Sequence, residues 1–261
     1  MGVPGTAVPR KTRLLAGGPP PADAGGMTTT LITGANKGLG FETARRLLAA
    51  GHTVHLGARD PERGRRAAEQ LGAHFVQLDV TDDASVAAAV KEIEAAGGLD
   101  VLVNNAGIEP RRPDGAFVDP TQTTADAVRT VFETNVFGIV RTLHAFLPLL
   151  RRSANPVVVN VSSGLALASA LADPASPTHF YPDLAYPSSK AAVNMLTVQY
   201  AKAFGDIRIN AVDPGFTRTD LNHNTGTQSV EEGAAIIVQM ACIGADGPTG
   251  TFRNAAGPLP W

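Results

Sequence analysis

From Met27 onward, short runs rich in β-branched residues alternate with longer amphipathic stretches. This alternation is typical of parallel strands joined by helices, because each crossover must return the chain to the start of the next strand. Right-handed crossovers of this kind give a doubly wound α/β sheet with a ligand crevice at the carboxyl ends of its strands. The pattern therefore predicts a mostly parallel sheet with helices on both faces, in a single domain over residues 27–261.

The expected elements are all of ordinary length for such a domain. The expected strands are residues 29–33, 53–57, 74–78, 101–103, 157–161, 208–212 and 250–253. The clearest expected helices are residues 39–50, 62–71, 83–96, 124–150, 186–204 and 230–241. No apolar run approaches the ~18 residues that a membrane helix needs, so no membrane partner is expected.

A glycine-rich turn lies between the first expected strand and the first expected helix, where residues 33–40 read TGANKGLG. Gly34, Gly38 and Gly40 allow a tight turn and a close approach of a pyrophosphate, whose charge faces the helix N-terminus. A purely structural loop is the alternative. The position of the turn between strand and helix favours a dinucleotide site.

Tyr186 and Lys190 are four residues apart in an expected helix and therefore share one of its faces. A nearby ammonium favours the phenolate and lowers the pKa of a phenol from its usual value of about 10. Such pairs also occur by chance on exposed helix faces, so the weight of this one depends on the other motifs. Tyr181 serves as an internal control, because its i+4 neighbour is Ala185 and no cation accompanies it.

Further motifs follow in a fixed order along the chain. They are Asp79-Val80 after the third strand, Asn104-Asn105-Ala106-Gly107 after the fourth, Asn135 in the long helix, Ser163, Tyr186 with Lys190, and Pro214-Gly215 followed by Thr217. With this ordered set, the chain from Met27 to its C-terminus resembles the short-chain dehydrogenase/reductase family, and within it the carbonyl reductases. The resemblance implies a Rossmann-type fold and an NAD(P)-dependent enzyme acting on CH-OH or C=O groups.

The resemblance also implies a catalytic set of Asn135, Ser163, Tyr186 and Lys190. Tyr186 would be the general acid in carbonyl reduction and the general base in alcohol oxidation, while Ser163 would hydrogen-bond the substrate oxygen. Lys190 would lower the pKa of Tyr186 and bind the nicotinamide ribose, and Asn135 would hold a water linking Lys190 to solvent. Ser162 would point to the other side of the strand end. A buried, structurally bonded amide is the alternative for Asn135.

Cofactor-binding residues are implied at the ends of several strands. Asp79 would bind the adenine amino group, unless it caps the next helix, and Thr217 would bind the nicotinamide carboxamide, unless it is an ordinary turn threonine. The full expected set is Gly34, Asn36, Lys37, Gly38, Leu39, Gly40, Arg59, Asp79, Val80, Asn105, Ala106, Gly107, Tyr186, Lys190, Pro214, Gly215 and Thr217.

The end of the second expected strand predicts a preference for NADP(H), with NAD(H) possible. A carboxylate there selects the ribose 2′-hydroxyl of NADH, whereas an arginine accommodates the 2′-phosphate. This chain has Ala58 where the family's acid would stand and Arg59 directly after it, and Lys37 adds a second positive charge. The alternative is that both cations are solvated surface charges. Asp60 is expected to cap the helix that begins at Pro61 rather than to pair with Arg59.

Charge and cysteine content exclude several classes of partner. The net charge is −2, with 24 acidic and 22 basic residues interspersed, which disfavours nucleic acid. The single cysteine, Cys242, has no internal disulfide partner, and neither it nor the 6 scattered histidines has metal-ligand spacing. We therefore expect a cytoplasmic protein without a metal, and the resemblance implies a small-molecule carbonyl or alcohol substrate.

Two segments depart from the family pattern. Residues 1–26 are rich in Gly, Pro and Ala and are predicted to be a disordered N-terminal extension, with Met27 as the functional start. An organellar transit peptide is the weaker alternative for them. Residues 164–185 form a longer connection than the family usually has and resemble the insertions of monomeric carbonyl reductases, which leaves both monomer and homo-oligomer open.

The sequence thus predicts an NADPH-dependent oxidoreductase that transfers a hydride between the nicotinamide and a ketone, an aldehyde or a secondary alcohol. A catalytically idle NADP(H)-binding sensor or scaffold is one alternative, although such a protein needs no tuned phenol. A sugar-nucleotide epimerase or dehydratase is another, but such chains usually have a longer C-terminal substrate domain. The substrate would be bound by the segments after Gly107, Gly164 and Gly215, and its identity is not predicted.

Overall fold

The computed structural model describes residues 27–112 and 115–261, so the disordered extension predicted for residues 1–26 lies outside the described residues. The strands are β1 (Thr29–Ile32), β2 (Thr53–Ala58), β3 (His74–Gln77), β4 (Val101–Asn104), β5 (Val157–Val161), β6 (Arg208–Val212), β7 (Phe252–Asn254) and β8 (Gly257–Leu259). They form one sheet in the order β3-β2-β1-β4-β5-β6-β7-β8. Neighbouring strands are parallel except for the β7–β8 pair. This order confirms the predicted doubly wound sheet, and β8 is an antiparallel addition that was not predicted.

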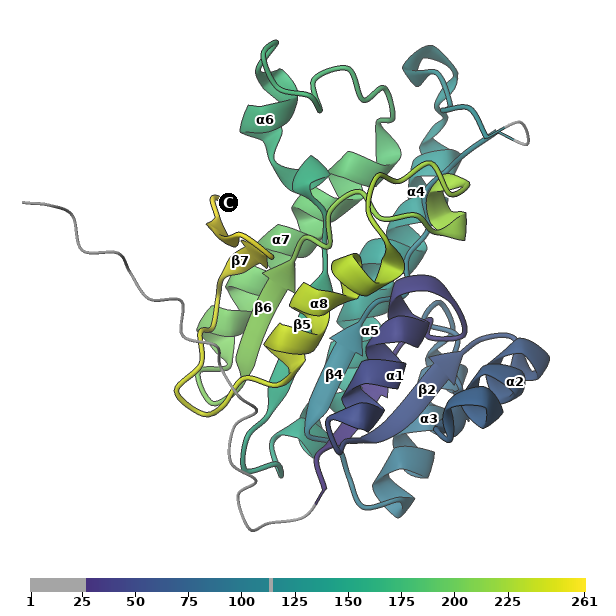
Figure 1. The fold of residues 1–261 in the computed structure, drawn as a ribbon, viewed down its shortest axis with the longest axis vertical. Coiled ribbons are helices and arrows are strands. Elements are labelled where there is room, and N and C mark those ends of the chain that lie inside the picture. Colours follow the sequence, from purple (N-terminus) through teal and green to yellow (C-terminus); the bar gives the residue numbers. More distant parts are fainter. Residues whose placement is uncertain (1–26, 113–114) are drawn as a thin grey trace, which may run out of the picture.

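Helices cover both faces of the sheet (Figure 1). They are α1 (Gly38–Ala49), α2 (Pro61–Leu71), α3 (Asp83–Ala95), α4 (Ala125–Phe132), α5 (Gly138–Leu150), α6 (Ala168–Ala172), α7 (Ala185–Ala203) and α8 (Val230–Ala241). Short 3₁₀ turns occur at Pro120–Gln122, Gly164–Ala166 and Asp220–Asn222. The single helix predicted for residues 124–150 is wrong as a continuous α-helix, because a π-helical turn at Glu133–Phe137 separates α4 from α5.

The core consists of two apolar layers, one on each face of the sheet. Ile32 packs with Leu47 of α1 and lies in the cluster that includes α8. The preceding residue, Leu31, lies in the opposite cluster with Ile93 of α3 and Phe146 of α5. Because successive strand residues point to opposite faces, a central parallel strand must be apolar on both. This explains the nearly continuous apolar runs from which the strands were predicted.

Local capping sets where two of the helices begin. The carboxylate of Asp60 accepts hydrogen bonds from the backbone N–H groups of Glu62 and Arg63, both at 3.0 Å, which confirms the predicted N-cap of α2. Asp82, rather than Asp79, caps α3. The alternative role of Asp79 as a helix cap is therefore wrong, since its carboxylate accepts from the backbone N and the Oγ1 of Thr81 at 2.9 and 2.7 Å.

The parallel strands all end at one edge of the sheet, where the connections to the following helices gather. α6, α4 and the segment after β6 lie at this end, which is uppermost in Figure 1. Within residues 27–112 and 115–261, no helix is long and apolar enough to span a membrane. The functional groups predicted at the strand ends are thereby brought to a single place.

Candidate active site

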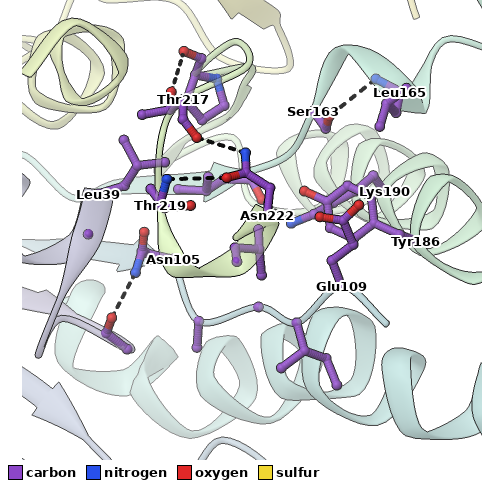
Figure 2. A pocket seen from close by; sticks show the side chains of 18 of the residues that line it. Leu39, Asn105, Glu109, Ser163, Leu165, Tyr186, Lys190, Thr217, Thr219 and Asn222 are labelled. Atoms are coloured by element: carbon purple, nitrogen blue, oxygen red, sulfur yellow. Dashed lines mark hydrogen bonds between the residues drawn. The ribbon is translucent and has the colours of Figure 1, made fainter. Parts of the chain in front are cut away.

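A cavity of about 1010 Å³ opens at the carboxyl ends of the strands. It is lined by the glycine turn, by the segments that follow β3, β4, β5 and β6, and by the start of α7 (Figure 2). Every residue of the expected cofactor-binding set lines this cavity, and so does Ser163. Asn135 is the exception among the expected site residues, because its neighbour Thr134 reaches the cavity in its place.

The glycine turn brings backbone close to the cavity. Gly34 and Gly38 have positive φ angles of 63° and 56°, which favour glycine. A Cβ atom on Gly40 would lie 2.5 Å from Nδ2 of Asn105, which itself donates to the carbonyl oxygen of Thr33 at 2.8 Å. The first turn of α1 has no side-chain cap from Lys37. Its N–H groups are therefore available to an anion, as a pyrophosphate site requires.

The first turn of α7 is held in place by a buried carboxylate. Asp183 accepts hydrogen bonds from the backbone N–H groups of Ala185 and Tyr186 at 3.1 and 3.0 Å. Tyr186 in this turn is 8% exposed, and Lys190 in the next turn is 4% exposed. Nζ of Lys190 lies 5.4 Å from the Tyr186 ring centroid. The predicted shared face of these two residues is confirmed, and this face is buried at the cavity.

The predicted lowering of the Tyr186 pKa is wrong for the protein chain alone. The pKa of Tyr186 is raised, first by burial and then by the charges of Glu109 and Asp213, while a side-chain hydrogen bond to Ser163 acts in the opposite direction. Burial also lowers the pKa of Lys190 to about 8. Burial is the largest cause of both shifts, since it disfavours the charged form of either group. Tyr186 is consequently a protonated phenol at neutral pH.

The two serines after β5 have different surroundings, as predicted. The hydroxyl of Ser162 is buried and donates to Oδ1 of Asn194 at 2.7 Å. Ser163 lies at the cavity, where its Oγ accepts from the backbone N of Leu165 at 3.2 Å (Figure 2). Only Ser163 combines a position at the cavity with a hydrogen bond to Tyr186.

Asn135 joins the segment after β4 to the helix that holds Tyr186. Its Oδ1 accepts from the backbone N of Ile108 at 2.8 Å, and its Nδ2 donates to the carbonyl oxygen of Ile108 and to Oγ of Ser189 at 2.9 and 3.0 Å. Ser189 in turn donates to the carbonyl oxygen of Tyr186 at 2.7 Å. These bonds occupy both amide hydrogens of Asn135. The observed contacts are therefore those of a buried, structurally bonded amide, which was the alternative expectation. A role in proton relay stays a prediction.

The cations expected to recognise the 2′-phosphate differ in their present partners. Nζ of Lys37 lies 2.9 Å from Oδ2 of Asp220, in an exposed ion pair that links the glycine turn to the segment after β6. Arg59 lies at the cavity, and no ion pair joins it to Asp60 among the described residues. Asp60 instead lies 3.6 Å from Arg63. Arg59 thus lines the cavity without an ion pair to a described carboxylate, whereas Lys37 is already paired with Asp220.

The segment after β6 is braced by its own side chains. Oγ1 of Thr217 is buried and accepts from Nε2 of Gln228 at 2.7 Å. Nδ2 of Asn222 donates to the carbonyl oxygen of Thr217 at 2.8 Å, and its Oδ1 accepts from the backbone N of Thr219 at 3.3 Å (Figure 2). These contacts fit a structural threonine, and the expected role of Thr217 toward a carboxamide stays a prediction.

A charged and aromatic cluster at the cavity was not predicted from the sequence. Nη2 of Arg111 lies 2.7 Å from Oε1 of Glu109, and the hydroxyl of Tyr181 donates to the same carboxylate. The guanidinium carbon of Arg111 lies 3.6 Å from the ring centroid of Phe117. One signal was present, because Glu109 closely follows the Asn104–Gly107 motif at a strand end. Tyr181 had no such local signal, since its partner is 72 residues away along the chain.

Among the described residues, no group of three or more His, Cys, Asp or Glu side chains is arranged to hold a metal ion. The groups at the cavity are instead a buried phenol, an ammonium, a serine hydroxyl and an uncapped helix N-terminus. This set suits the binding of a phosphate-bearing ligand beside a proton-transfer centre.

Known proteins are similar to this chain in sequence and in fold. The family model described as short chain dehydrogenase matches residues 28–230. Short-chain dehydrogenase/reductase 1 of Saponaria officinalis is 36% identical, with 88% of this chain and 95% of that protein covered. Carbonyl reductase (NADPH) 1 of Rattus norvegicus is 33% identical, with 88% and 97% covered. The structure of NADPH bound carbonyl reductase from chicken fatty liver superimposes with a TM-score of 0.78 at 27% identity, covering 90% of this chain and 99% of that chain.

Proposed function

The chain belongs to the short-chain dehydrogenase/reductase family, and from this membership we propose that it is an NADPH-dependent reductase of a ketone or aldehyde, with the reverse oxidation of a secondary alcohol. The observation that carries the proposal is the meeting of Ser163, Tyr186 and Lys190 in the cavity that the glycine turn also lines. Two of the similar proteins named above are carbonyl reductases with NADPH in their names.

The residues at the glycine turn fit a dinucleotide. A side chain at Gly40 would collide with Asn105, so the cradle is kept open for a close ligand, and the uncapped start of α1 faces it. Arg59 and Lys37 would hold the 2′-phosphate, and Asp79 the adenine. NADPH bound there supplies the hydride for reduction.

Tyr186 and Ser163 would act together on the substrate oxygen. Ser163 donates a hydrogen bond to this oxygen and stabilises the negative charge that develops on it. Tyr186 donates the proton, for which its raised pKa keeps it protonated at neutral pH. The chain thereby supplies both a proton and electrostatic stabilisation to the same atom.

Lys190 would bind the nicotinamide ribose and keep a positive charge near the phenol. Its Nζ donates to the carbonyl oxygen of Val161 at 2.7 Å, which leaves two of its three hydrogens for a ligand. Asn135 would support this arrangement from behind through Ser189. The free Cys242 fits a reducing compartment, and we extend the proposal to a cytoplasmic location.

A panel of ketones and aldehydes, followed by the loss of NADPH absorbance, tests the proposal. We expect turnover of at least one carbonyl compound with NADPH. Measurable NADPH binding without turnover of any compound would contradict the proposal and would favour an idle NADP(H)-binding sensor or scaffold.

A further inference from the structure

We infer that Tyr181 is a specificity-determining residue, whose ring forms one wall of the substrate end of the cavity and limits the size of the carbonyl compound that reaches Tyr186. The inference rests on the proposed function, because a substrate wall presupposes a carbonyl substrate at Tyr186. It concerns the cluster of Glu109, Arg111, Phe117 and Tyr181, which is called the aromatic wall below.

The aromatic wall is built from two segments that are distant in the sequence. Arg111 and Phe117 face each other in an antiparallel bridge after β4, whereas Tyr181 belongs to the long connection between β5 and α7. The rings of Phe117 and Tyr181 meet edge to face, with centroids 4.8 Å apart and planes inclined by 74°. All four side chains line the same cavity as Ser163 and Tyr186. The wall therefore bounds the space beside the reacting groups.

Buried charges hold Tyr181 in its place. The side chains of Glu109 and Arg111 are 5% and 8% exposed, so their ion pair is shielded from water. A buried carboxylate must be paired and hydrogen-bonded to be tolerated. Arg111 supplies the charge, and the hydroxyl of Tyr181 supplies a second donor to Glu109. The connection that carries Tyr181 is thus joined to the segment after β4 by a hydrogen bond from a neutral hydroxyl to a charged carboxylate. Such a hydrogen bond is stronger than one between two neutral groups.

The same bond excludes Tyr181 as a second proton donor. Its hydrogen is committed to Glu109, and burial together with that carboxylate raises the pKa of Tyr181. Its role is therefore to present a fixed ring rather than to exchange protons.

The wall lies within electrostatic range of the reacting centre. The charge of Glu109 contributes to the raised pKa of Tyr186, as do Asp213 and, more weakly, Asp183. Figure 2 shows the Glu109 side chain extending toward Tyr186 and Lys190. Because the wall and Tyr186 line the same cavity, we expect a compound whose carbonyl oxygen reaches Tyr186 to place its remaining atoms against the wall.

Three substrates of increasing bulk, acetophenone, 2-acetylnaphthalene and benzophenone, test the inference in the full-length chain. We expect Tyr181→Ala to raise kcat/KM for the bulkier ketones relative to acetophenone by about tenfold or more, because pocket contacts discriminate by ~10–200-fold. Tyr181→Phe keeps the ring but removes its bond to Glu109. It should therefore preserve the size ranking and raise KM several-fold with little change in kcat.

Tyr200→Ala is the matched control, since Tyr200 lies on α7, stacks on Phe204 and does not line the cavity. It removes an equal ring, so a general loss of stability would lower all rates alike without changing their ratio. NADPH dissociation constants should be the same in all variants. If Tyr181→Ala does not fold, Tyr181→Leu is measured instead, because leucine also removes the ring and leaves a smaller side chain.

The outcomes separate the two proposals. Reduction by the wild-type chain with an unchanged size ranking in Tyr181→Ala or Tyr181→Leu would overturn the role of the wall and leave the proposed function standing. Failure of the wild-type chain to reduce any ketone or aldehyde would overturn the proposed function itself, and the wall with it. A gain in kcat/KM for the bulkier ketones relative to acetophenone in Tyr181→Ala or Tyr181→Leu, but not in Tyr181→Phe or Tyr200→Ala, supports the inference.

Discussion

Nζ of Lys190 donates to the carbonyl oxygen of Val161 at 2.7 Å and lies 5.4 Å from the centroid of the Tyr186 ring. The ammonium is therefore anchored to the end of β5 rather than to the phenol. Because the two groups are buried together, their protonation states depend on the same low-dielectric surroundings. Single substitutions can therefore distinguish proton donation, ribose binding and pKa control at this site.

Tyr186→Phe should abolish most turnover while leaving NADPH binding intact. It removes the proton donor but keeps the ring, and general acid catalysis typically contributes ~10²–10⁴ in rate. Steady-state rates and an NADPH titration by fluorescence measure the two effects. Turnover close to the wild-type rate would rule out the assigned role of Tyr186.

Lys190→Met should weaken NADPH binding as well as turnover. Hydrogen bonds to charged groups contribute roughly 1.5–3 kcal/mol, so the dissociation constant is expected to rise by ~10–150-fold. Lys202→Met, in the last turn of the same helix, is the control and should change neither quantity. Unaltered NADPH binding in Lys190→Met would contradict its assignment to the ribose.

Asp213→Asn should shift the pH dependence of reduction. The raised pKa of Tyr186 keeps the proton donor available at neutral pH, so kcat/KM for reduction should fall only as the pH rises through that pKa. Removing the charge of Asp213 lowers the pKa of Tyr186 and moves this fall to lower pH. Asparagine can still accept from the backbone N of Gly215, as Asp213 does at 3.0 Å. An alkaline fall in kcat/KM that occurs at the same pH in the wild type and in Asp213→Asn would contradict an action of Asp213 on Tyr186.

Arg59→Ala should reduce the preference for NADPH over NADH by ~10–150-fold, the value of one charge-assisted hydrogen bond. We expect kcat/KM with NADH to be nearly unchanged. Arg63→Ala, in the first turn of α2, removes an equal charge outside the cavity and serves as the control. Lys37→Ala should have a smaller effect, because Lys37 must first give up its contact with Asp220. An undiminished NADPH preference in Arg59→Ala would refute the predicted recognition of the 2′-phosphate.

His55 should make the protein less stable in acid. It is 3% exposed, neither ring nitrogen has a hydrogen-bond partner among the described residues, and burial with the nearby charge of His74 lowers its pKa from 6.5 to about 4. Between pH 6.5 and about 4, the unfolded chain therefore binds a proton at His55 that the folded protein does not bind. The contribution of neutral His55 to the free energy of unfolding is fully present above pH 6.5. It is lost as the pH falls toward 4, by an amount on the order of 3 kcal/mol.

Urea unfolding at pH 7.5 and pH 4.5 measures this effect. His55→Leu should lose less stability between the two pH values than the wild-type protein does. His74→Gln, at the exposed neighbouring position on β3, is the control and should retain most of the acid sensitivity. Equal losses in wild type and His55→Leu would exclude His55 as the cause.

Local spacing was sufficient to predict the parts of the site that depend on one segment each. The glycine turn needs only a strand, a tight turn and a helix in succession, and the shared face of Tyr186 and Lys190 follows from the helical repeat. The bounds of β5 and β6 were predicted without error, because a parallel strand buried on both faces is a short apolar run between turns. The cap at Asp60 likewise depends only on its immediate neighbours.

Features of the site that require separate segments to come together in space were decided by the tertiary structure alone. The π-helical turn around Asn135 is stabilised by bonds to Ile108 and Ser189, and an amphipathic repeat does not reveal the extra residue in such a turn. The sign of the Tyr186 pKa shift depends on burial and on Glu109 and Asp213, which come from different connections. Electrostatic energy depends on distance and on the surrounding dielectric, neither of which is encoded in sequence spacing. For the same reason sequence spacing did not reveal that Tyr181, in the connection before α7, donates to the carboxylate of Glu109.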